Sequence, residues 1–181
     1  MKLEKILVPL DGSPLAEAAL ATAVEMARAS GAPLLLLRAA QAHTLPGVDP
    51  TEAEVRVVRE AETYLGEVEE RLATAGVTNV EATVWYGPAA PAIVEAAQFH
   101  KASMIVMTTH GRTGLGRLIL GSVAESVLRG TTTPILLLRA EGATVDVPGG
   151  HAEARPSSTT PLEAQRLAEA VVSRAARDRN G

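Results

Sequence analysis

The chain has 181 residues, of which 46% are hydrophobic and only 2% aromatic, and its formal net charge is −4. A core of Val, Leu, Ile and Ala suits a parallel sheet covered by helices better than a β-sandwich. The acidic balance without a basic block, the few aromatic rings and the lack of Cys argue against a nucleic-acid surface, an electrostatic membrane anchor, disulfides and thiolate metal sites.

Two elements are expected at the start of the chain. Lys5–Pro9 is an apolar run typical of a buried strand. Ser13 is a good helix N-cap, and Pro14 suits the first helical position, where no amide bond is lost. We therefore predict a helix that ends just before Gly31, a residue that can close it in a left-handed conformation.

The middle of the chain continues the alternation of strands and helices. Pro33–Leu37 is almost wholly leucine and predicts a second strand. After a loop, Thr51–Glu54 fits a capping box and opens a long charged helix that ends near Gly76. The alternating segment Val80–Tyr86 then predicts a third strand.

The same order is repeated up to residue 140. Pro88 starts a helix that reaches the region of His100, and Met104–Met107 predicts a fourth strand. Ser122–Glu125 fits a second capping box at the start of a further helix, and Pro134–Leu138 predicts the fifth strand.

The predicted order is therefore βαβαβαβαβ. This alternation predicts an α/β domain, with an open five-stranded parallel sheet and helices on both faces. Ligands of such sheets bind beyond the carboxyl ends of the strands, where the strand order reverses. Two loops are placed to form that site, Pro9–Gly12 after the first strand and residues 108–122 after the fourth.

The second of these loops has features of an anion site. Its internal glycines, which let main-chain amides approach a ligand closely, are Gly111, Gly114 and Gly116. Gly121 and Ser122 stand where a helix begins, and the amides and dipole of a helix N-terminus favour a polyphosphate. The spacing matches neither the common P-loop nor the dinucleotide fingerprint. From the residues alone, a nucleotide site and a flexible connection before a capped helix weigh about evenly.

Charged side chains of both loops have two interpretations each. Asp11 is either a ligand for a ribose or a metal-bound water, or a turn residue of the Asp-Gly-Ser-Pro sequence. Arg112 and Arg117 are either donors to phosphate oxygens or solvated surface residues. His110 has no partner nearby in the sequence for acid–base catalysis, and we interpret it as a residue at the rim of the pocket.

The end of the chain has a different composition. Residues 141–159 are rich in Gly, Pro, Ser and Thr and are predicted to be a linker after a domain formed by residues 1–140. Thr160–Glu163 fits a capping box at the start of a helical extension, residues 160–179, with apolar residues roughly on one face. Docking on the domain, binding a partner and partial order all stay open for this extension.

Three blocks of the sequence together resemble the universal stress protein family. The stretch Thr108-x-x-Gly111, nine residues, Gly121-Ser122 is similar to the nucleotide loop of the family's ATP-binding branch, which has Gly, two residues, Gly, nine residues, Gly and then Ser or Thr. The stretch Ile6–Ser13 resembles the family's first strand and turn. Gly121–Val127 followed by Pro134–Leu138 resembles its last helix and strand.

The resemblance implies a Rossmann-like, adenine nucleotide alpha hydrolase-like fold with strand order 3-2-1-4-5. The residues expected to bind the nucleotide are Pro9, Leu10, Asp11, Ala39, Met107, Thr108, Gly111, Arg112, Gly121, Ser122 and Val123. The first three would border the adenine and ribose, and Ala39 would offer main-chain hydrogen bonds to the adenine. The two glycines with Ser122 and Val123 would hold the phosphates. Thr108 stands where the family has its first loop glycine, so its side chain bears on affinity and nucleotide choice.

The function implied is that of a nucleotide-binding stress-response or regulatory protein. We expect ATP as the ligand, with Mg²⁺ or Mn²⁺ held through its phosphates, and output through a conformational or dimer change toward a regulatory protein partner. The resemblance also suggests a homodimer through the fifth strand, whose exposed edge could otherwise aggregate.

Two alternatives remain beside this function. One is a dimeric interaction protein of the same fold that binds no nucleotide, and the other is a slow ATP hydrolase, because no residue set for efficient phosphoryl transfer can be named. We assign no catalytic residue and no protein metal ligand. The chain lacks an apolar run that could span a membrane, and its first residues do not resemble a secretory signal, so we expect a cytoplasmic protein.

Overall fold

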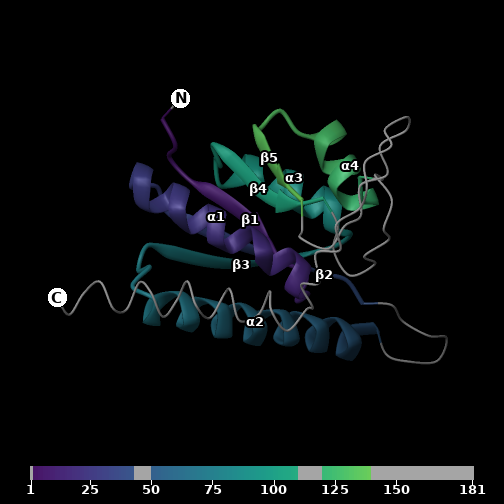
Figure 1. Ribbon diagram of the computed structural model, residues 1–181. Coiled ribbons are helices and arrows are strands. Elements are labelled where there is room, and N and C mark those ends of the chain that lie inside the picture. Colours follow the sequence, from purple (N-terminus) through teal and green to yellow (C-terminus); the bar gives the residue numbers. More distant parts are fainter. Residues whose placement is uncertain (1, 43–49, 110–119, 140–181) are drawn as a thin grey trace, which may run out of the picture.

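The computed structural model describes residues 2–42, 50–109 and 120–139 (Figure 1). Its strands are β1 (Ile6–Pro9), β2 (Leu34–Ala40), β3 (Val80–Tyr86), β4 (Met104–Thr108) and β5 (Ile135–Leu138). Its helices are α1 (Pro14–Ser30), α2 (Pro50–Thr74), α3 (Ala89–Phe99) and α4 (Ser122–Gly130). The predicted linker 141–159 and extension 160–179 lie outside the described residues.

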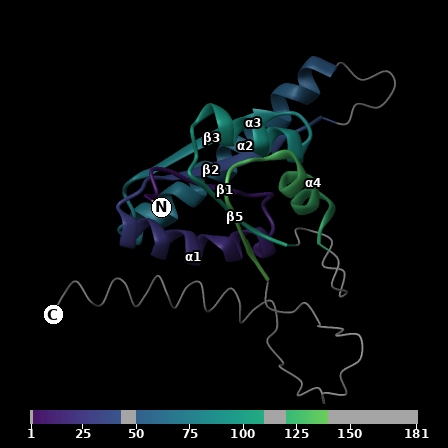
Figure 2. The same ribbon diagram turned by 90° about the horizontal axis from the view of Figure 1, so that it is seen from above.

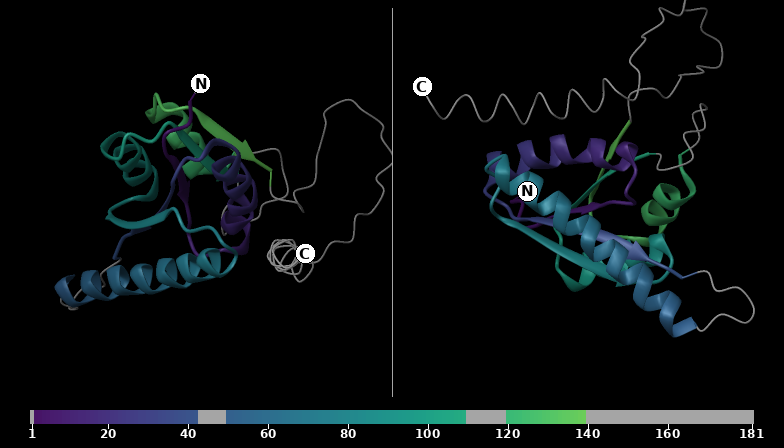
Figure 3. Two further views of the ribbon diagram at one scale, coloured as in Figure 1. Left: turned by 90° about the vertical axis from the view of Figure 1, so that its left-hand side faces the viewer. Right: turned by 90° about the horizontal axis from the view of Figure 1, so that it is seen from below.

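The strands form one parallel five-stranded sheet in the order β3-β2-β1-β4-β5, which confirms the predicted Rossmann-like fold. The helices α1 and α2 cover one face of this sheet, and α3 and α4 cover the other, so that α1 and α3 lie on opposite sides (Figure 2). The N-terminal end of α2 projects beyond the sheet (Figure 3). Within the described residues, no helix is both long and apolar enough to cross a membrane.

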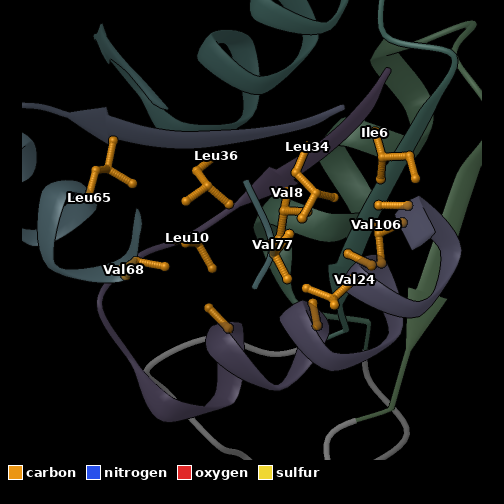
Figure 4. Packing of buried hydrophobic residues seen from close by; sticks show 14 of the residues in the cluster. Ile6, Val8, Leu10, Val24, Leu34, Leu36, Leu65, Val68, Val77 and Val106 are labelled. Atoms are coloured by element: carbon orange, nitrogen blue, oxygen red, sulfur yellow. The ribbon is translucent and has the colours of Figure 1, made fainter. Parts of the chain in front are cut away.

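The leucine run of β2 serves both faces of the sheet. Leu34 and Leu36 pack into the cluster beneath α1 and α2 (Figure 4), whereas Leu35 and Leu37 pack into the cluster beneath α3 and α4. Side chains alternate between faces along a strand, and a strand buried on both faces is therefore apolar throughout. Each leucine buried in this way contributes about 1.5–3 kcal/mol relative to an exposed one.

The predicted ends of α1 are confirmed. The Ser13 hydroxyl accepts a hydrogen bond from the Ala16 amide at 3.1 Å, and Pro14 occupies the first turn. At the other end, Gly31 has a φ of 72° and its amide donates to the carbonyl of Ala27. Since α1 follows β1 directly, this cap also fixes the position of the first loop.

Both capping boxes predicted within the described residues are wrong. The helix α2 already includes Pro50, so Thr51 lies inside it. The N-cap of α4 is Gly121, and Ser122 is the first helical residue. The Ser/Thr-x-x-Glu pattern arises here because acidic residues favour the first turn of any helix, where they interact with its dipole.

The strand β2 is longer than predicted. The apolar run ends at Leu37, but the strand continues to Ala40 because Arg38, Ala39 and Ala40 pair with Val84 to Tyr86 of β3. Pairing with β3 thus keeps the charged residue Arg38 within the strand. This extension places Arg38 and Ala39 at the carboxyl edge of the sheet.

Candidate functional site

A hollow of about 300 Å³ opens at the carboxyl edge of the sheet, where β2 and β4 continue on either side of β1. It lies between the ends of these strands and the first residues of α3 and α4. Its lining residues are Pro9, Leu10, Asp11, Ala16, Leu37, Ala39, Ala89, Ile93, Met107, Thr108, Thr109, Gly121, Ser122, Val123 and Ala124. The reversal of strand order at β1 explains its position, because β1 leads to α1 on one face of the sheet and β4 leads to α4 on the other.

The structure brings most of the predicted binding residues together. The predicted residues that line the hollow are Pro9, Leu10, Asp11, Ala39, Met107, Thr108, Gly121, Ser122 and Val123. The other two, Gly111 and Arg112, lie outside the described residues, as do His110 and Arg117.

The helix α3 also contributes to the hollow, which no motif in the sequence predicts. Ala89 and Ile93, from the first turns of α3, line the hollow opposite Leu37 of β2. Their position follows from the topology, since a helix that starts directly after the carboxyl end of β3 begins at the same edge as the site. The order of elements could therefore have revealed them, although no motif marks these two apolar residues.

The main chain of Ala39 faces the space that β1 leaves. β1 pairs with β2 as far as Pro9 opposite Leu37, and the Leu10 amide then donates to the Leu37 carbonyl at 2.8 Å. Main-chain groups of alternate residues in a strand point toward the same neighbour. The N–H and C=O groups of Ala39 therefore point to the same side as β1. They lie beyond Pro9 and Leu37, the last paired residues of the two strands. A donor and an acceptor stand side by side at the wall of the hollow.

The N-terminus of α4 provides donors at the opposite wall. Gly121 has no side-chain capping bond to offer, and its own amide donates to the Thr109 carbonyl at 2.8 Å. The amides of Ser122, Val123 and Ala124 have no partner within the helix, because the first intrahelical bond is donated by Glu125. These three amides and the positive end of the helix dipole form an environment suited to an anion.

A tight turn holds the carboxylate of Asp11 at the edge of the hollow. Asp11 Oδ1 accepts hydrogen bonds from the Ser13 amide at 2.9 Å and from the Ser13 hydroxyl. The residue between them, Gly12, has a φ of 79°, a conformation that side chains disfavour. The two interpretations of Asp11, as a turn residue and as a ligand residue, are thus compatible, since the turn holds Asp11 in the lining of the hollow.

A network of polar side chains lies beneath this turn, on the α1 and α2 side of the sheet. The Arg38 guanidinium lies over the Tyr64 ring, 4.8 Å from its centroid. The Tyr64 hydroxyl donates to Glu17 at 2.8 Å, and Arg71 donates to both oxygens of Glu17 at 3.0 Å. Burial and the hydrogen bond to Glu17 raise the pKa of Tyr64 well above its ordinary value. The bond to Glu17 also raises the pKa of Arg71.

A second, more open hollow of about 640 Å³ lies along α2. Its described lining residues, between Thr51 and Glu67, all come from this one helix. A single helix cannot surround a small ligand, whereas the hollow at the carboxyl edge joins strands, loops and two helix N-termini. The site at the carboxyl edge is therefore the stronger candidate.

Comparison with known proteins identifies a family whose pattern covers most of the chain. The sequence model of the Universal stress protein family matches residues 2–139. A universal stress protein of Thermus aquaticus is 37% identical over 136 residues, which cover 74% of this chain and 97% of the relative. One from Methanocaldococcus jannaschii is 31% identical over 141 residues, 75% of this chain and 82% of the relative.

Solved structures agree with the sequence matches. Universal stress protein UspA from Lactobacillus plantarum superposes with a TM-score of 0.68 at 26% identity, over 77% of this chain and 99% of the other. A universal stress protein crystallised in complex with cAMP superposes with a TM-score of 0.62 at 25% identity, again over 77% of this chain and 99% of the other.

The raised pKa of Tyr64 predicts a specific loss of stability at alkaline pH. In the unfolded chain the phenol ionises near its ordinary pKa of 10.0, whereas the folded protein retains the proton. Above that pH the folded state binds more protons, so the free energy of unfolding falls as pH rises. We expect Tyr64→Phe to be less stable by about 1 kcal/mol at neutral pH and to approach the wild type above about pH 10.

Urea unfolding at a series of pH values measures this difference. Tyr86, whose pKa is also raised through its hydrogen bond to Glu54, is present in both proteins and cancels from the comparison. A difference between the two proteins that stays constant from neutral to alkaline pH would contradict the assignment.

Proposed function

Because the chain belongs to the universal stress protein family, we propose that it is a nucleotide-binding regulatory protein whose ligand is ATP. The observation that carries this proposal is the single hollow at the carboxyl edge of the sheet, where an apolar wall and a row of helix N-terminal amides face each other. An adenine nucleotide has matching ends, a flat base and an anionic chain of phosphates.

The adenine is proposed to bind at the end of β2. Leu37, Ala89 and Ile93 supply an apolar surface for the base. The N–H and C=O groups of Ala39 can pair with the base edge, since adenine presents a ring nitrogen acceptor beside its amino donor. Asp11, held by its turn, is proposed to receive the ribose hydroxyls as hydrogen-bond donors.

The phosphates are proposed to bind at the N-terminus of α4. The amides of Ser122 and Val123 and the Ser122 hydroxyl are among the donors on the described part of this wall. The amide of Gly121 is engaged with Thr109, so we propose that Gly121 contributes by leaving space for the phosphates. Thr108, which is 6% exposed, forms part of the floor and limits how deeply the phosphates enter.

A divalent cation is proposed to reach this site with the nucleotide. The described residues contain no group of three or more His, Asp or Glu side chains that could hold a metal ion. A Mg²⁺ or Mn²⁺ ion would therefore be held chiefly by the phosphates, with Asp11 as the nearby carboxylate of the described lining. Its chemistry there would be to neutralise phosphate charge.

The output of binding is proposed to pass through a homodimer formed along β5. This strand is at the edge of the sheet, and its side chains, Ile135 to Leu138, are each only half-buried. Leu128 of α4 is 51% exposed. An apolar edge strand favours pairing with a second copy. Light scattering should give the mass of two chains, and the mass of one chain at micromolar concentration would contradict the dimer.

Calorimetry with ATP and Mg²⁺ tests the nucleotide site. We expect the wild type, freed of co-purified nucleotide, to bind with a Kd on the order of micromolar. The double variant Gly121→Val, Ser122→Ala should bind at least about tenfold more weakly, because it fills the phosphate wall and removes a hydroxyl donor. Gly121 has φ −57° and ψ 146°, which valine adopts readily, so the variant is expected to fold.

Ser126→Ala is the matched control, since Ser126 lies one turn further along α4 and outside the lining of the hollow. Titration with cAMP, the ligand named for one of the similar structures, should compete for the same site. If the folded wild type binds neither nucleotide, the alternative function is favoured, that of a dimeric interaction protein that binds no nucleotide.

A further inference from the structure

Arg38 occupies a position in the sheet where a charge is unusual. It belongs to β2 and lies on the face opposite to its neighbour Ala39, above the core formed by Leu36, α1 and α2. On one side its guanidinium lies over the ring of Tyr64. On the other side it meets the first loop of the nucleotide site at Gly12.

The guanidinium approaches Gly12 closely, and a side chain at residue 12 would force it to move. A Cβ atom at residue 12 would lie 2.7 Å from Arg38 Nη1, nearer than such atoms approach each other in proteins. The φ of 79° disfavours a side chain at the same position for an independent reason. The guanidinium therefore lies directly against the main chain of the turn between Asp11 and Ser13.

One nitrogen of the Arg38 guanidinium, Nη1, is buried without a hydrogen-bond partner in the described part of the chain. Such an atom costs free energy, and its presence in a folded protein calls for an explanation. The contacts that do hold the side chain are the Tyr64 ring and the turn, and both are suited to a flat guanidinium.

We infer that Arg38 is a positioning residue of the nucleotide site, which supports the Asp11–Ser13 turn from below and thereby fixes Asp11 at the wall of the hollow. The inference rests on the proposed function as far as the ligand is concerned. Tyr64 holds the other side of the guanidinium, and it is anchored to α1 through Glu17. A displacement of α2 would therefore reach the nucleotide loop through Tyr64 and Arg38.

Hydrogen exchange of the Ser13 amide tests this role without any ligand. This amide donates to Asp11 Oδ1, so its exchange reports opening of the turn. In Arg38→Met, which keeps the length of the side chain but loses the flat charged group, we expect Ser13 to exchange about tenfold faster. The Ile105 amide in β4, bonded to the Pro134 carbonyl, serves as the reference for global unfolding.

Two variants serve as controls for the exchange measurement. Arg59→Met makes the same chemical change at an exposed position of α2 and should leave Ser13 unchanged. Tyr64→Phe keeps the ring beneath the guanidinium and should also leave Ser13 close to wild type, whereas Tyr64→Leu should reproduce the effect of Arg38→Met. Equal acceleration of amide exchange at Ser13 and Ile105 would overturn the inference, because it would show that Arg38 stabilises the whole fold rather than the turn. Unchanged exchange at Ser13 would overturn it as well.

Measurements of ATP affinity in two backgrounds distinguish a failure of this inference from a failure of the proposed function. If Arg38 acts through Asp11, Arg38→Met should weaken ATP binding about tenfold in the wild type and have little further effect in an Asp11→Ala background. An equal loss in both backgrounds would overturn the inference and leave the proposed function intact. A wild type that binds no nucleotide would overturn the proposed function, while Ser13 exchange would still decide whether Arg38 orders the turn.

Discussion

β1 stops pairing at Pro9 and Leu10, while its neighbour β2 continues to Ala40, and the candidate site depends on this difference in length. Past that point, Ala39 of β2 has main-chain groups that β1 does not cover. Because the strand order reverses at β1, β1 leads to α1 on one face of the sheet and β4 leads to α4 on the other. The leucines of β2, buried on both faces, anchor the β2 side of the site in the core.

Among the helix N-termini at this edge, those of α1 and α4 differ in their capping. In α1 the Ser13 hydroxyl satisfies the amide of Ala16, a contribution of about 1 kcal/mol to the stability of a helix. In α4 no side chain caps the helix, and its first amides face the hollow. The helix α4 thus lacks a stabilising side-chain cap, and its first amides remain available as hydrogen-bond donors to an anion. The capped terminus holds Asp11 and Gly12 in place, with Arg38 and Tyr64 beneath them.

The order of elements could be predicted from the sequence because apolar runs, Gly and Pro mark the strands and their ends. The residues expected at the site came from the resemblance to the family, and those of them within the described part of the chain line one hollow. The site residues that were not predicted have a local sequence that does not indicate a binding site. Arg38 ends the apolar run, yet pairing with β3 keeps it in the strand. Ala89 and Ile93 are ordinary apolar residues that reach the site only through the packing of α3 on the sheet. The N-cap of α4 is Gly121, one residue before the position that the Ser-x-x-Glu pattern indicates.

The central claim is that one ligand bridges the end of β2 and the start of α4. Mapping of amide chemical shifts during titration with ATP and Mg²⁺ tests it most directly. The account predicts that the largest changes occur together at Ala39 on one wall and at Ser122 and Val123 on the other, at the same ligand concentration. Changes confined to the lining of the hollow along α2, between Thr51 and Glu67, with the shifts of Ala39 and Ser122 unchanged, would contradict it.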